Sequence, residues 1–158
     1  WGEEKTKTWL EGIVANGANV YAKNTPTVEA TGAGEIEVGF VNHYYLHRFI
    51  AANTESFKAR NYFLPGGGPG SVVLVAGAGV LQESDNKDGA EAFIKFMLSK
   101  PAQAYFANET YEYPLVEGVK KNHLLPDLDT LNLPDIDISD LGDIAATQKL
   151  LQETGALP

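Results

Sequence analysis

A short apolar run passes directly into a helical pattern in the first third of the chain, and this junction constrains the fold most. Residues 36–41 form a mostly apolar run rich in β-branched side chains, which predicts a strand. Asn42 follows, where its side chain can cap a new helix. Five residues then recur at spacings typical of one helical face: Leu46, Phe49, Ile50, Asn53 and Phe57. A strand that leads straight into a helix is typical of α/β proteins.

Two adjacent tyrosines, Tyr44 and Tyr45, stand at this junction. Ligands of open α/β sheets bind at the carboxyl ends of strands, and a helix N-terminus adds a positive potential there. A phenol has a pKa of about 10 in water, and a hard, highly charged cation stabilises its phenolate form. Two such oxygens suit Fe(III) better than a soft ion. The alternative is that both tyrosines are half-buried packing residues with hydrated hydroxyl groups.

Helical and extended patterns alternate along the rest of the chain. Helices are expected at residues 4–16, 25–34 and 87–100, from Pro101 onward, and in a last segment that ends near Gly155. That last helix is expected to turn Leu141, Ile144, Ala145 and Leu151 inward. Further strands are expected at residues 20–22 and 62–64 and from Ser71 onward. This rhythm predicts an α/β fold with parallel strands and right-handed crossovers.

Composition excludes several classes of function. The chain has 158 residues, of which 44% are hydrophobic and 21% charged, as in a soluble globular domain. Its net charge of −9 argues against nucleic-acid binding, and the absence of cysteine excludes disulfides and thiolate metal sites. No apolar run is long enough to span a membrane. No signal peptide opens the chain, and its start at Trp1 favours a mature product or an excised fragment.

Four motifs invite a catalytic or nucleotide-binding interpretation, and each is incomplete. The glycine-rich residues 66–70 are not followed by the Lys-Ser/Thr pair of a phosphate loop, and Gln82 replaces the third glycine of a dinucleotide fingerprint. His43 and His47 lie four residues apart, but Tyr44 stands where a zincin-type site needs glutamate. A G-x-S-x-G nucleophile elbow is absent. Structural roles are therefore the better interpretation for these residues.

Several stretches together resemble one family. Residues 39–45 and the apolar helix after them resemble the tyrosine-pair motif of the periplasmic ferric-iron-binding proteins, the substrate-binding components of ABC-type Fe(III) transporters. Residues 66–80, 90–106 and 111–116 match the same family in order. The resemblance spans essentially the whole chain but only the C-terminal half of the family.

The resemblance implies a type 2, two-lobed periplasmic-binding-protein fold of the α/β class, represented by its C-terminal half. Residues 1–72 would form the α/β segment of the C-terminal lobe that carries the tyrosine pair. Residues 73–120 would cross over to complete the N-terminal lobe, and residues 121–158 would return as the C-terminal helix of the first lobe. Such a fragment would expose apolar surfaces. A homodimer, a swapped assembly or a missing companion segment would cover them.

The resemblance also assigns site residues. Tyr44 and Tyr45 match the pair that binds Fe(III) as phenolates. Asn42 and Asn24 match residues that bind a synergistic anion, such as carbonate, phosphate or citrate. The simpler interpretation is that Asn42 only caps its helix and Asn24 only begins a turn. The family's remaining ligands, a histidine with a carboxylate or further tyrosines, come from the other half, so this chain is expected to bind the metal weakly or not at all.

The expected function is binding of Fe(III), with or without a synergistic anion, for delivery to an inner-membrane ABC permease. The expected location is the periplasm, and the protein is expected to be neither an enzyme nor membrane-spanning. The alternative within the same transporter class is binding of another small anion or solute. A remote alternative is an acidic α/β enzyme.

Overall fold

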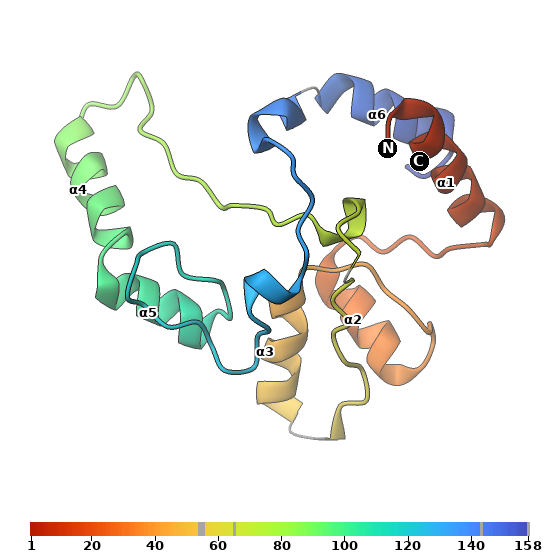
Figure 1. Ribbon diagram of the computed structural model, residues 1–158, viewed down its shortest axis with the longest axis horizontal. Coiled ribbons are helices and arrows are strands. Elements are labelled where there is room, and N and C mark those ends of the chain that lie inside the picture. Colours follow the sequence, from red (N-terminus) through yellow and green to blue (C-terminus); the bar gives the residue numbers. More distant parts are fainter. Residues whose placement is uncertain (54–55, 65, 143, 158) are drawn as a thin grey trace. The chain divides into compact units, whose positions relative to one another are not determined.

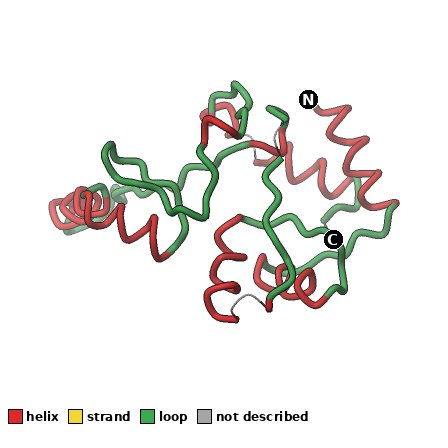
Figure 2. The backbone as a smooth tube through the Cα atoms, turned by 60° about the horizontal axis from the view of Figure 1, so that its bottom comes forward, coloured by secondary structure: helices red, strands yellow, loops and turns green. Residues whose placement is uncertain are grey.

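The computed structural model describes residues 1–53, 56–64, 66–142 and 144–157, and their regular structure is helical (Figures 1 and 2). The side chain of Asn53, expected on a helix face, lies outside the described part. None of the described helices has the length and apolar composition needed to cross a bilayer. The α-helices are α1 (Glu3–Ala15), α2 (Asn24–Ala33), α3 (His43–Asn53), α4 (Lys87–Met97), α5 (Lys100–Glu109) and α6 (Ile144–Glu153). Short 3-10 segments are η2 (Pro69–Ser71), η3 (Leu128–Thr130) and η4 (Ile138–Gly142), the last with a kink at Leu141.

The expected helices form, and their caps explain where two of them begin. The Asn86 side chain accepts a hydrogen bond of 3.1 Å from the Gly89 amide at the start of α4. Ser99 does the same for Ala102 at the start of α5, at 3.4 Å, and Pro101 occupies the first turn of that helix. Because Ser99 caps α5, α4 ends at Met97 and does not continue to residue 100.

The expected strands do not form. Residues 20–22, 36–41, 62–64 and the segment after Ser71 contain no strand, and Figure 2 colours no described segment as one. Val38 and Phe40 are 75% and 72% exposed. A strand is stable only when its backbone amides and carbonyls pair with a neighbouring strand, and the described residues supply no such partner.

Two expected helix faces also differ. Phe57 lies beyond the end of α3, where its ring stacks on Phe49 with centroids 5.3 Å apart and closely approaches Gly32 of α2. At the other end of the chain, α6 begins only at Ile144, which is 66% exposed, and Leu141 belongs to η4. The Asp137 carboxylate accepts hydrogen bonds from the Ser139 amide and hydroxyl, which favours a separate turn here.

The chain divides into two compact units. The first comprises Trp1–Ala22, Leu64–Leu74 and Leu131–Pro158, and the second Lys23–Phe63 and Val75–Thr130. In the first unit, Leu10 of α1 is buried, and the backbone at Gly155 lies against Val14. In the second unit, α2 packs on α3, and α4 packs on α5 (Figure 1). Its buried apolar side chains are Val28, Ala30, Leu46, Ala102, Ala107 and Leu125.

Helix α4 keeps much of its apolar stripe uncovered. Phe93 and Phe96 are 59% and 60% exposed, and their rings stack on each other with centroids 6.5 Å apart. Ile94 and Met97 are half-buried. An apolar face of this kind is unfavourable in water unless something covers it.

Gln103 connects α5 to the segment that follows it. This side chain is only 5% exposed, donates to the Met97 carbonyl at 2.9 Å and accepts from the Leu115 amide at 2.8 Å. The Gln103 side chain thus supplies a hydrogen-bond partner to the Met97 carbonyl and to the Leu115 amide. Gln103 therefore fixes the beginning of the irregular segment 111–138 against α5.

We expect Gln103→Leu to lower the free energy of unfolding by about 1–3 kcal/mol, because two part-buried backbone groups lose their partners. The matched control is Gln148→Leu, since Gln148 is exposed on α6 and should tolerate the change. Urea unfolding followed by circular dichroism measures both. Equal midpoints for the two variants would contradict the role assigned to Gln103.

Candidate functional site

The N-terminal turn of α3 brings together four residues that were predicted from the sequence. The Asn42 amide donates to the Asn24 side-chain oxygen at 3.0 Å, and the Asn42 side-chain amide donates to the Tyr44 hydroxyl at 3.2 Å. The rings of Tyr44 and Tyr45 have centroids 4.7 Å apart at an interplanar angle of 33°. Both tyrosines are half-buried, and Asn42 is exposed. Asn24 begins α2, so helices α2 and α3 both contribute to this cluster.

Two opposing influences act on the Tyr44 phenol. Burial raises the pKa of Tyr44 above its ordinary value, and the neighbouring Tyr45 and Glu112 act in the same direction. The hydrogen bond from Asn42 lowers this pKa, because it stabilises the phenolate oxygen. The Arg48 guanidinium lies 5.4 Å from the centre of the Tyr44 ring and 5.7 Å from that of Tyr45. It therefore packs on both rings from one turn further along α3.

His43 and His47 lie on the side of α3 that meets residues 111–113. His43 Nε2 donates to the Tyr111 carbonyl at 2.7 Å, and the His47 ring stacks on the Tyr111 ring with centroids 5.0 Å apart. His47 is 8% exposed, and burial lowers its pKa, with a smaller contribution from His43. No group of three or more His, Cys, Asp or Glu side chains suited to a metal occurs within the described ranges. The contacts of His43 and His47 with Tyr111 are a hydrogen bond and a ring-packing contact.

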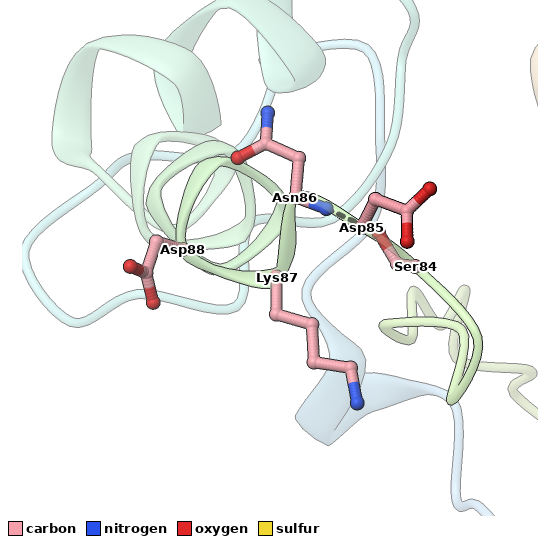
Figure 3. Close-up of a pocket in the computed structure, with 5 residues that line it drawn as sticks. All are labelled: Ser84, Asp85, Asn86, Lys87 and Asp88. Atoms are coloured by element: carbon pink, nitrogen blue, oxygen red, sulfur yellow. Dashed lines mark hydrogen bonds between the residues drawn. The ribbon is translucent and has the colours of Figure 1, made fainter.

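A shallow hollow at the start of α4 offers no comparable arrangement. It is lined by five consecutive residues, 84–88, and Figure 3 shows the side chains of Asp85, Lys87 and Asp88 pointing in different directions. The Asn86 amide donates to the Ser84 hydroxyl at 3.3 Å, and Asn86 caps the helix. Convergent polar groups, which binding sites require, are lacking there.

Asn61 and Tyr111 contribute to the surroundings of the tyrosine pair and were not predicted from the sequence. The Asn61 side chain donates to the His43 carbonyl at 2.8 Å and lies 3.4 Å from His47 Nε2. Neither residue belongs to a periodic pattern, so only its place in the folded chain reveals the contact. Residues 111–116 resemble the corresponding segment of the family, but the resemblance assigned no role to any of them.

Comparison with known proteins identifies the class. Residues 2–145 match the family model described as bacterial extracellular solute-binding protein, and the chain belongs to this family. Over 96% of the chain, the backbone superposes on the crystal structure of iron-bound HitA from Pseudomonas aeruginosa with a TM-score of 0.87 and 29% sequence identity. The fold is therefore that of the type 2 periplasmic binding proteins, as expected. The chain covers 49% of that structure.

Two curated relatives are similar in sequence over 98% of this chain. Iron uptake protein A1 of Synechocystis is 34% identical over 161 residues, and the match covers 45% of that protein. The major ferric iron-binding protein of Neisseria meningitidis serogroup B is 32% identical over 155 residues, with 46% of that protein covered. The chain thus spans about half the length of the curated relatives it matches.

The Asn42–Tyr44 hydrogen bond generates a prediction about pH. Removing its donor in Asn42→Ala should raise the pKa of the Tyr44 phenol further, because the phenolate loses a hydrogen bond while burial remains. Tyrosine labelled with carbon-13 at Cζ allows each phenol to be titrated separately by NMR. Asn19→Ala is the control, since Asn19 is exposed in the other unit. A Tyr44 titration that stays unchanged or moves to lower pH in Asn42→Ala would contradict the assignment.

Proposed function

We propose that the chain supplies the tyrosine side of a ferric-iron site in a transport binding protein. The observation that carries the proposal is the hydrogen-bonded cluster of Asn24, Asn42 and Tyr44 with the Tyr45 ring against it. Its phenol oxygens are ligands that Fe(III) favours as a hard cation. The ferric-iron-binding names of the relatives and the iron-bound state of the superposed structure support the same cargo.

In this proposal, Tyr44 and Tyr45 bind the metal as phenolates. Asn42 and Asn24 hold a synergistic anion, such as carbonate, phosphate or citrate. An amide can donate to an anion, and the α3 N-terminus adds a favourable potential. Asn42 would then exchange its contact with Tyr44 for one with the anion.

The wider proposal follows the family. The protein carries Fe(III) in the periplasm to an ABC permease of the inner membrane and binds its cargo without chemical conversion. Residues 1–72 and 121–158 belong to the C-terminal lobe, and residues 73–120 complete the N-terminal lobe. Membership of an extracellular solute-binding family supports a transport role outside the cytoplasm.

The chain alone is expected to bind iron weakly. Ionising a phenol with a pKa of about 10 at pH 7 costs about 4 kcal/mol, and the raised pKa of Tyr44 adds to this cost. The described residues offer no cluster of further metal-binding side chains. Ligands and a closing lobe from the rest of a full-length family member would supply additional stabilisation.

Titration with ferric citrate tests the proposal. We expect the chain to develop a weak visible tyrosinate-to-iron band, and either Tyr44→Phe or Tyr45→Phe to reduce the apparent affinity by about a hundredfold or more, since loss of even an outer-shell partner costs 10–100-fold. Tyr62→Phe is the matched control, because Tyr62 is 78% exposed and lies outside the cluster. A band whose apparent affinity is unchanged in both Tyr44→Phe and Tyr45→Phe would contradict the proposal. Tight iron binding that needs neither tyrosine would also contradict it.

A further inference from the structure

Tyr111 has a backbone conformation that a tyrosine rarely adopts. It follows Thr110, the C-cap of α5, and its φ is +60°. Glycine normally takes this left-handed position after a helix, because a Cβ atom makes it unfavourable. The other described non-glycine residue with positive φ is Asn132, and asparagine tolerates this region better. A conformation of this kind persists when its surroundings hold it.

Helix α3 provides that support through two residues on one face. His43 Nε2 donates to the Tyr111 carbonyl at 2.7 Å, and the His47 ring stacks on the Tyr111 ring at an angle of 24°. The ring of His43 also contacts that of Tyr113, with centroids 5.8 Å apart. Since a carbonyl only accepts hydrogen bonds, His43 carries its proton on Nε2 in this arrangement.

The same histidine borders the proposed ligands. His43 directly precedes Tyr44, and their rings have centroids 5.6 Å apart. Its own carbonyl accepts a hydrogen bond from Asn61 at 2.8 Å, so the first turn of α3 is held by the end of α5 and by residue 61. Successive residues of a helix are about 100° apart around its axis. A small rotation of this turn would therefore redirect both phenols.

We infer that His43 is a positioning residue for the tyrosine pair: its hydrogen bond to the Tyr111 carbonyl fixes the first turn of α3 against the end of α5. The inference rests on the proposed function for the role of the pair as metal ligands. The connection itself is a property of the metal-free protein and can be tested without iron.

The first measurement uses the unaltered 158-residue chain without metal. Nitrogen-15 NMR of the imidazole rings at a pH where His43 is neutral should show the His43 proton on Nε2. A proton found on Nδ1, with Nε2 unprotonated, would overturn the inference.

The second measurement compares variants at the same position. His43→Phe keeps a ring and removes the donor, whereas His43→Gln keeps an amide donor able to reach the Tyr111 carbonyl. We expect His43→Phe to speed amide exchange in the first turn of α3 by about tenfold, the size of one hydrogen bond, and to shift the ring signals of Tyr44 and Tyr45. His43→Gln should restore both. The matched control His123→Phe alters an exposed loop histidine and should change neither.

Unchanged ring signals and exchange in His43→Phe would overturn the inference. If that variant does not fold, Tyr111→Gly decides, because glycine keeps the carbonyl and favours the left-handed backbone while it removes the ring stacked on His47. The tyrosine signals should then remain close to those of the unaltered chain. Their loss in Tyr111→Gly would show that stacking, and not the His43 bond, positions the pair.

Adding ferric citrate separates this inference from the proposed function. His43→Phe should weaken the tyrosinate band and His43→Gln should restore it. If the unaltered chain gives no band while His43→Phe still shifts the metal-free tyrosine signals, iron binding by these residues alone fails and the positioning role stands. A band in the unaltered chain that His43→Phe leaves unchanged would overturn the positioning role alone.

Discussion

The hydrogen bond between the Asn42 amide and the Asn24 side chain joins the beginning of α3 to the beginning of α2. This contact matters because the chain between these residues has no strand to hold it in place. It sets the position of residue 42, whose side chain reaches the Tyr44 hydroxyl. Tyr44 and Tyr45 are successive residues of the first turn of α3, so the position of residue 42 also determines where their two rings lie. The proposed site therefore depends on two neutral amides and a helix N-terminus, without a buried charge.

Extended segments outside any β-sheet are the second feature of the described residues. Val38, Phe40 and Leu74 are each at least 70% exposed, and Phe93 and Phe96 leave an apolar face of α4 open. The superposition on HitA nevertheless covers 96% of the chain and about half of that structure. The backbone thus follows the path of its family where local sequence and helix packing define it. Hydrogen-bonded strands need partners distant in sequence, which the described residues do not provide.

Prediction from the sequence succeeded where the signal is local. Pro101 marked the start of a helix by its own chemistry, and the adjacent tyrosines lie in the first turn of a helix, as expected. The prediction of a strand at residues 36–41 was wrong, because the backbone hydrogen bonds of a strand depend on a second segment and not on local sequence alone. Asn24 was assigned from the family resemblance, since nothing in its local pattern indicates a contact with a residue 18 positions away. The contact of Tyr111 with α3 had no sequence signal, because tyrosine is disfavoured in the left-handed conformation.

The central claim is that the hydroxyl oxygens of Tyr44 and Tyr45 together bind ferric iron. Anomalous X-ray scattering at the iron absorption edge, from crystals of the protein soaked in ferric citrate, tests it most directly. The account predicts an anomalous peak within bonding distance of both tyrosine oxygens, with the Asn42 side chain turned toward an anion beside the metal. A peak bound to other side chains, with both tyrosine hydroxyls remote from it, would contradict the account.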